Sequence, residues 1–389
     1  MKLLANLLVG LAALSHAGFL VLEMFFLFSM MLLCSHLAHA LPLAPKPLRL
    51  AIAGLTHTHV HWILGRPERG DIEILGIQEP YRKLAERYAK QYGLREELFF
   101  TDLEQMLETV KPAAVTAFGT TFDHLKVVQA CAPRGIHVMV EKPLAVNLEQ
   151  ALAIEALANK HAIYVLTNYE TTWYSSTQAL DDLILQQQLI GPIRKIVVHD
   201  GHQGPKEIGV NEEFLEWLID PVRNGGGALM DFGCYGANLA TWLMRGLGPQ
   251  TVTAITQQIK PEIYSAVEDE ATIIITYPKA QAIIQASWNW PFNRKDIEVY
   301  GRTGYVHAPD GQSLRVRKEN ETREQLQALA QRSAPTDDPF AYLAAVVHGE
   351  IKVADGDLSS LGNNVMVMRI LEAAKQSAAT GKTVKLAPR

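Results

Sequence analysis

The stretch Val138-Met139-Val140-Glu141-Lys142-Pro143 is an apolar run that ends in a charged pair and a proline. This pattern is typical of a buried strand that reaches the carboxyl edge of a sheet, where open α/β folds bind their ligands. A lysine at that edge lies against a packed core and loses part of its hydration, which suits it to polarise an anion or a hydroxyl. The alternative is a strand-ending lysine whose ammonium extends into solvent.

Strands and helices alternate on both sides of this stretch, which predicts an α/β fold with a doubly wound parallel sheet. We expect strands at Leu48–Ala53, Ile72–Ile77, Ala113–Phe118, Ile136–Val140 and Ala162–Thr167. The expected helices begin near Val60 or cover Arg82–Tyr92, Leu103–Val110, Phe122–Ala132 and Val146–Lys160.

The first strand, the turn at Gly54 and an acid after the second strand form a dinucleotide fingerprint. Glu79 lies 25 residues after Gly54, and its carboxylate can bind the ribose hydroxyls of NAD and repel the 2′-phosphate of NADP. Arg82 follows Glu79 closely enough in the sequence that NADP stays an alternative cofactor. The fingerprint is incomplete because Thr56 and His59 replace its second and third glycines. Thr56 either weakens nucleotide binding or donates its hydroxyl.

Three histidines follow the turn, at His57, His59 and His61. Residues two apart on a helix point in roughly opposite directions, so we expect them not to converge and predict no metal site. Turn and helix-cap roles are the favoured interpretation. His124, after the next loop, either lines the nicotinamide pocket or caps its helix.

Beyond Asn168 the pattern changes to β-rich runs joined by short turns, which predicts a large, mainly antiparallel sheet with helices on one face. A second subunit is the usual cover for the other face, so we expect a homo-oligomer, a dimer or tetramer. The predicted domains are therefore 41–168 for the nucleotide and 169–389 for substrate and oligomerisation. The runs are Ile193–His199, Val252–Ile259, Ala271–Tyr277, Ala282–Trp290 and Ile297–Tyr300.

Ahead of Val252 stands Gly225-Gly226-Gly227-Ala228-Leu229-Met230-Asp231-Phe232-Gly233-Cys234-Tyr235. We expect one helix here, with Asp231, Tyr235 and Asn238 on a shared face. A glycine run before a helix lets another backbone or a ligand approach closely. The alternative is a packed helix whose Tyr and Asp are hydrogen-bonded in the core. For the aromatic stripe Trp288–Phe292, core or subunit packing is favoured over substrate stacking.

The N-terminal segment 1–40 is apolar from Leu3 to Leu33 and ends in the small residues around Ala40. It predicts a cleaved signal peptide and export to the periplasm or medium, or an uncleaved membrane anchor. The whole chain, 48% hydrophobic and 20% charged, has the composition of a two-domain globular protein. A net charge of −5 without a basic tract gives no reason to expect nucleic acid, and the three cysteines have no zinc or disulfide spacing.

After Pro47 the chain resembles the Gfo/Idh/MocA family, which includes glucose–fructose oxidoreductase and inositol dehydrogenase. The resemblance rests on the motifs Glu141-Lys142-Pro143, Gly225-Gly226-Gly227-x-Leu229-x-Asp231-x-Gly233, and Glu372-Ala373-Ala374-x-x-Ser377 with Gly381-Lys382-x-Val384. It implies an NAD(P)-dependent oxidoreductase acting on sugars, polyols or their derivatives, and a cis bond between Lys142 and Pro143. Many members carry His at position 235, Asp at 238 and an arginine near Thr172, and this chain departs from all three.

The resemblance also implies site residues. Tyr235 would be the acid/base, as in the glucose–fructose oxidoreductase and dihydrodiol dehydrogenase branch. Lys142 would lower its pKa, and Asp231 would orient Lys142 or accept a substrate hydroxyl. The implied cofactor-binding residues are Gly54, Leu55, Thr56, His57, Glu79, Gly119, Thr120, His124, Glu141, Lys142 and Asn168.

Two alternative functions stay open. Some members are NAD-dependent glycosidases that retain the nucleotide and oxidise a ring hydroxyl only transiently. A non-catalytic exported sugar-binding protein is the other, since the incomplete glycine turn and the export signal both favour it.

Overall fold

The structure is a computed structural model that describes residues 46–387, so the predicted signal peptide or anchor lies outside the described residues. From Pro47 onward the chain forms one compact unit. Among the described residues, no helix combines the length and the apolar character that a bilayer crossing needs.

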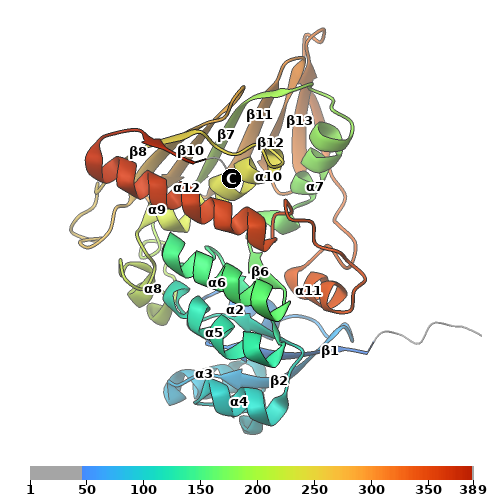
Figure 1. Cartoon of the computed structure of the whole chain (residues 1–389), viewed down its shortest axis with the longest axis vertical. Coiled ribbons are helices and arrows are strands. Elements are labelled where there is room, and N and C mark those ends of the chain that lie inside the picture. Colours follow the sequence, from blue (N-terminus) through green and yellow to red (C-terminus); the bar gives the residue numbers. More distant parts are fainter. Residues whose placement is uncertain (1–45, 388–389) are drawn as a thin grey trace, which may run out of the picture. The chain divides into compact units, whose positions relative to one another are not determined.

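The first sheet is the predicted parallel, doubly wound sheet (Figure 1). Its six strands run in the order β3-β2-β1-β4-β5-β6, and all neighbouring strands are parallel. The strands are β1 Leu48–Ala53, β2 Ile72–Gln78, β3 Phe99–Phe100, β4 Ala114–Ala117, β5 His137–Glu141 and β6 Val165–Asn168. The connecting helices are α2 Val60–Leu64, α3 Arg82–Tyr92, α4 Leu103–Val110, α5 His124–Cys131 and α6 Leu148–His161.

Local signals explain these boundaries. Asp102 caps α4 by accepting the Gln105 N–H at 2.8 Å, and Gly93 ends α3 in the left-handed conformation, as predicted. Strand β1 is buried on both faces: Ala51 packs in one hydrophobic core, and Leu50 and Ile52 in the other. Burial on both faces is what a parallel sheet covered by helices requires.

The second sheet has nine strands in the order β14-β13-β12-β11-β7-β10-β9-β8-β15, antiparallel except for the β7–β10 pair. The sequence predicted the five strands β7 to β11 but not β12 to β14. In β13, charged residues such as Arg315 and Arg317 obscure the apolar pattern that would have indicated a strand. The strands are β7 Ile193–Gly201, β8 Thr251–Gln257, β9 Glu270–Thr276, β10 Gln281–Ser287, β11 Arg294–Gly301, β12 Gly304–Asp310, β13 Ser313–Lys318, β14 Gln325–Ala328 and β15 Val384–Lys385.

Helices join the two sheets. In Figure 1, α12 (red) lies between the strands of the second sheet and α6, and it contacts β8, α10 and α6. Helix α11 returns to the first sheet, where Phe340 and Leu343 pack in the same core as Leu50. The remaining helices are α7 Ser175–Leu180, α8 Glu212–Leu218, α9 Ala228–Asp231, α10 Gly233–Leu243, α11 Pro339–Val347 and α12 Leu361–Thr380.

The predicted single helix through Asp231 and Asn238 is wrong: α9 and α10 are two helices that break at Phe232. The Glu268 carboxylate accepts the Gly227 and Leu229 N–H groups at 2.9 and 3.0 Å and so fixes where α9 starts. Gly225, with φ +83°, lies directly against the Val146 backbone, so the predicted close backbone approach is confirmed. The break separates Asp231 from Asn238, whose amide donates to Leu358 O instead.

Candidate active site

Lys142 follows β5 at the carboxyl edge of the first sheet, and only 6% of its side chain is exposed. Its ammonium forms an ion pair with Asp231 Oδ1 and also donates to the Asp231 carbonyl at 3.1 Å. The Lys142–Pro143 peptide bond is cis, as the resemblance implied. Burial lowers the pKa of Lys142, but the charge and hydrogen bond of Asp231, together with Cys234 and Glu141, outweigh burial, so the pKa is raised and the group is an ammonium.

Asp231 holds this ammonium in place. Its second oxygen, Oδ2, accepts the indole N–H of Trp288 at 3.0 Å. Burial raises the pKa of Asp231, but Lys142, with smaller contributions from His202 and Trp288, outweighs burial, and the pKa lies below the usual value. Trp288 is fully buried, so the predicted core packing of the aromatic stripe is confirmed for this residue. The sequence did not reveal that its N–H also fixes the aspartate.

Tyr235 lies in the first turn of α10, and the Lys142 ammonium is 5.3 Å from the centre of its ring. The predicted lowering of the Tyr235 pKa is wrong. Burial raises that pKa well above 10, and the charge of Glu170 raises it further. The site therefore holds a neutral phenol beside the Lys142 ammonium, which is paired with Asp231.

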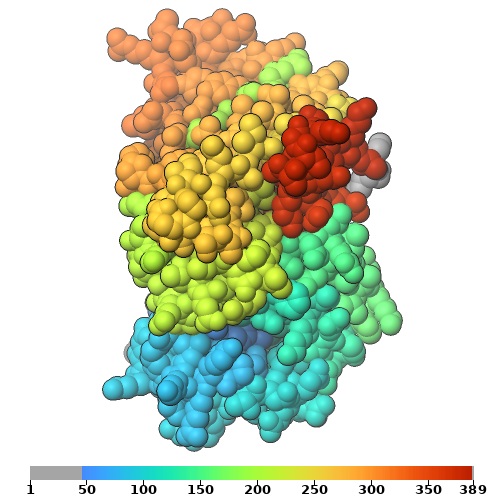
Figure 2. Space-filling model, turned by 90° about the vertical axis from the view of Figure 1, so that its left-hand side faces the viewer, coloured from blue at the N-terminus to red at the C-terminus, as the bar shows by residue number. Residues whose placement is uncertain are grey.

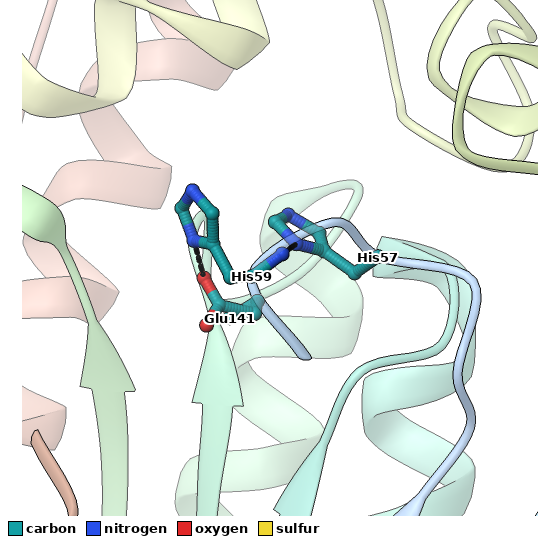
Figure 3. A group of neighbouring side chains, drawn as sticks. All are labelled: His57, His59 and Glu141. Atoms are coloured by element: carbon teal, nitrogen blue, oxygen red, sulfur yellow. Dashed lines mark hydrogen bonds and ion pairs between the residues drawn. The ribbon is translucent and has the colours of Figure 1, made fainter. Parts of the chain in front are cut away.

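Glu141 and Asn168 end two adjacent strands and are hydrogen-bonded to each other. The Asn168 amide donates to Glu141 Oε1 at 2.8 Å, and His59 Nδ1 lies 2.9 Å from Glu141 Oε2 (Figure 3). Burial raises the pKa of Glu141. The pair therefore places two polar groups of the first sheet next to Lys142.

The prediction that the three histidines diverge is wrong for His57 and His59, whose ring centres lie 4.5 Å apart. Both residues precede α2, so the helical argument does not apply to them. Figure 3 shows both rings beside Glu141. Of the three histidines, only His61 points away from the other two, and its ring nitrogens lie close to the hydroxyls of Tyr92 and Tyr88.

Both converging histidines are neutral. Burial lowers the pKa of His57 well below 6.5 and that of His59 to about 3. His57 Nδ1 accepts the His59 backbone N–H at 3.1 Å, whereas its buried Nε2 has no partner among the described residues. This nitrogen is free to bind a ligand.

One candidate donor atom from each of His57, His59 and Glu141 lies within 4.8 Å of the other two, and these are residue types that bind zinc. The surroundings oppose a cation. The ammonium of Lys142 lowers the pKa of both histidines, and Glu141 already accepts hydrogen bonds from His59 and Asn168. The group is better suited to hydrogen-bond an anionic or polar ligand.

A cavity of about 780 Å³ begins at the turn after β1. Gly54 has φ +81° and lies directly against the Gly119 backbone, so a side chain at this position would collide with it. In Figure 2, dark blue atoms near the start of the described chain lie in a hollow between light blue and yellow-green residues. The predicted cofactor residues that line this cavity are Gly54, Thr56, Glu79, Gly119, Thr120 and His124.

Polar atoms around this cavity fit a dinucleotide. Glu79 accepts the Leu55 and Tyr81 N–H groups at 3.0 and 2.8 Å, which orients its carboxylate and leaves further lone pairs for ribose hydroxyls. Thr56 Oγ1 and His124 Nε2 are buried without a partner among the described residues. His124 does not cap α5, since its Nδ1 lies 3.2 Å from Leu144 O, and Thr120 caps only the short 3-10 turn Thr121–Asp123, by accepting the Asp123 N–H at 3.2 Å.

The sequence reasoning missed Lys295 and Glu170. The Lys295 ammonium lies 4.6 Å from the centre of the Tyr235 ring and forms an ion pair with Glu170. The available signal was the charged triplet Arg294-Lys295-Asp296 at the start of an otherwise apolar strand.

Comparison with known proteins agrees with this geometry. Residues 48–169 match the profile of an oxidoreductase family with an NAD-binding Rossmann fold, and residues 178–307 match the GFO/IDH/MocA C-terminal domain.

Among curated relatives, 1,5-anhydro-D-fructose reductase of Ensifer adhaerens is 21% identical over 87% of this chain and 98% of its own length. Trans-1,2-dihydrobenzene-1,2-diol dehydrogenase of Xenopus tropicalis is 28% identical over 42% of this chain. The chain spans about half the length of that relative, 46%.

Two solved structures share the fold. Aldose-aldose oxidoreductase from Caulobacter crescentus has a TM-score of 0.73 at 21% identity, covering 88% of this chain and all of that one. An inositol dehydrogenase homologue from Azotobacter vinelandii, in complex with NAD+, has a TM-score of 0.74 at 18% identity, covering 88% and 98%. With both domain profiles matched in order, the chain belongs to the Gfo/Idh/MocA family of oxidoreductases and carries its NAD-binding Rossmann domain.

Proposed function

We propose that the protein transfers hydride between NAD and a hydroxyl-bearing or carbonyl carbon of a sugar, polyol or derivative. The observation that carries this proposal is the buried Lys142–Asp231 pair at the sheet edge, 5.3 Å from the Tyr235 ring centre. Relatives named as a reductase of anhydrofructose and a dehydrogenase of a cyclic diol support the substrate class.

NAD, when bound, supplies the hydride chemistry, and the protein's part is to position it and to handle the proton. Glu79 would bind the adenosine ribose, and Thr56 and His57 the pyrophosphate. His124, Gly119, Thr120 and the Glu141–Asn168 pair would surround the nicotinamide half. NAD is favoured over NADP because Arg82 points into solvent and pairs with Glu86.

Two groups can donate a proton to the substrate oxygen. The Lys142 ammonium carries three hydrogens and uses two of them on Asp231. The Tyr235 phenol is neutral because its pKa lies well above 10. At neutral pH the free site therefore favours reduction of a carbonyl, and oxidation of a hydroxyl requires the proton to be passed onward.

The test is the nucleotide content and turnover of the purified protein. We expect mass spectrometry to detect NAD, and a carbonyl sugar to consume NADH in a one-to-one ratio. Release of free sugar from a glycoside with no net change in nicotinamide absorbance would identify a glycosidase with retained cofactor. Absence of both NAD binding and turnover would leave a sugar-binding protein. Metal analysis should find less than one equivalent per chain, because His57, His59 and Glu141 are assigned to hydrogen bonding.

Two further expectations stay proposals. We propose export, from the apolar segment 1–40, and a homo-oligomer whose second copy covers the open face of the nine-stranded sheet, where 69% of Ile255 is exposed. N-terminal sequencing of the secreted protein tests export. Light scattering tests the oligomer, and a monomeric mass would contradict it.

A further inference from the structure

A second cavity, of about 490 Å³, lies around Lys295 at the start of β11. Two aromatic rings, Phe232 and Phe292, form apolar parts of its wall. Phe232 is also 6.0 Å from the Lys295 ammonium and 6.2 Å from the Tyr235 ring, so this cavity adjoins the acid/base group. The polar lining includes Glu170, Tyr174, His202, Arg294, Lys295 and Asp296.

Both cations in this lining are paired with carboxylates, and Asp310 adds a third carboxylate, which accepts the Gln312 N–H at 2.8 Å and the Ser313 hydroxyl at 2.7 Å. Lys295 pairs with Glu170, which also accepts the Tyr174 hydroxyl at 2.6 Å, and Arg294 pairs with Asp296 at 2.5 Å. Every lysine and arginine in the described lining thus has a carboxylate partner. A substrate phosphate or carboxylate would have to break one of these pairs, whereas hydroxyls can bind both members.

Neutral polar groups complete the lining. His202 Nδ1 accepts the Gly204 N–H at 2.9 Å, and burial lowers the pKa of His202 to about 4. The ring is therefore a neutral imidazole that offers Nε2–H as a donor. Its edge-on contact with Phe232, 4.8 Å between centres, fixes its orientation.

Asp200 provides an independent sign of a ligand. It lies opposite Lys295 in the β7–β11 register, so both side chains project from the same face of the sheet. Only 1% of Asp200 is exposed, and neither carboxyl oxygen has a partner among the described residues. Buried polar groups normally have partners, so this carboxyl group is suited to a polar ligand or water.

We propose that this cavity binds the reacting molecule as an electrically neutral, polyhydroxylated ring. Lys295 and Glu170 bind hydroxyls next to the one that reaches Tyr235, and Phe232 packs against the apolar face of the ring. Selection against acidic and phosphorylated sugars follows from the paired charges. This assignment rests on the proposed function, whose substrate it narrows.

The test compares neutral and charged probes on the full-length protein with NAD present. The neutral probes are myo-inositol, D-glucose and D-xylose, and the charged ones are D-glucuronate and D-glucose 6-phosphate. We expect calorimetry to give at least about tenfold tighter binding for a neutral probe, the value of one charge-assisted hydrogen bond.

Lys295→Met should weaken neutral-probe binding by about tenfold without changing NAD binding. Lys195→Met is the matched control, since this lysine lies in the adjacent strand β7 and bonds to Gln281 outside the cavity. We expect less than about a twofold change there. In turnover, Lys295→Met should raise KM more than it lowers kcat.

Three results would overturn the assignment: tighter binding of a charged probe, equal behaviour of the two lysine variants, or no binding of any neutral probe. The outcome is separable from the proposed function. Lys295-dependent binding without hydride transfer would keep the cavity and refute the oxidoreductase mechanism. Hydride transfer that Lys295→Met leaves unchanged would keep the oxidoreductase mechanism and refute the assignment of the cavity.

Discussion

Two ammonium groups lie near the ring of Tyr235, and they differ in how they are held. Lys142 and its partner Asp231 are each 6% exposed, whereas Lys295 and Glu170 are 22% and 34% exposed. Lys142 directly follows β5 of the first sheet, and Lys295 lies in β11 of the second. The Lys142–Asp231 pair is therefore part of the buried framework of the protein. The Lys295–Glu170 pair lines a cavity, where Lys295 can exchange Glu170 for a ligand.

The largest expected effect is on stability. Asp231→Ala leaves a buried ammonium unpaired and removes the partner of the Trp288 N–H, so the free energy of unfolding should fall by about 3–5 kcal/mol. Glu170→Ala exposes Lys295 to solvent and should cost about 0–1 kcal/mol. Urea unfolding measures both. Equal losses would show that the two pairs are not distinguished by burial.

The next effect is on turnover. Tyr235→Phe removes one hydroxyl from a buried ring and should lower kcat about 100-fold while NAD still binds, because the lost group handles the proton. Tyr169→Phe is the matched control, since its ring lies 5.3 Å from that of Tyr235. A Tyr235→Phe variant with the kcat of the parent would assign the proton to Lys142 alone.

A third prediction concerns the loss of stability at acidic pH that follows from the buried His59. Burial lowers the pKa of His59 from 6.5 to about 3, so below pH 6.5 the unfolded chain binds a proton that the folded chain does not. The His59 contribution to stability is therefore complete above pH 6.5 and is lost as the pH falls toward 3. Glu141, whose pKa burial raises, acts in the opposite direction.

Thermal unfolding between pH 7 and 4 tests this. His59→Gln removes the titrating group, so we expect a flatter decline of the melting temperature than in the parent. His348→Gln changes an exposed histidine and should leave the parent slope unaltered. A steeper decline in His59→Gln would mean that another group controls acid unfolding.

The smallest expected effect is on nucleotide affinity. Thr56→Val keeps the side-chain shape and removes the buried hydroxyl that lacks a partner, so the Kd for NAD should rise about fivefold, the value of one hydrogen bond. Thr58→Val, two residues along the same turn, serves as the control. An unchanged Kd in Thr56→Val would show that this hydroxyl does not replace the missing glycine.

Short-range patterns explain why so much of the fold could be predicted. The local signals are the helix caps at Asp102 and Gly93 and the apolar runs of β1 and β5. All of them are present in the structure. The start of α9 could not be predicted, because it depends on Glu268, which lies 41 residues beyond Gly227 along the chain. The convergence of His57 and His59 also depends on the course of a turn that no periodicity describes.

By itself the sequence determined the two sheets, the family resemblance, and the approach of Lys142 to Asp231 and Tyr235. The sheets follow from the periodicity of the apolar residues, whereas the approach of Lys142 to Asp231 and Tyr235 was implied by the family resemblance. Only the tertiary structure decided the protonation of Tyr235, the pairing of Lys295 with Glu170, and the isolation of Asp200. A pKa depends on burial and on every nearby charge, and these are set by segments that meet only after the chain has folded.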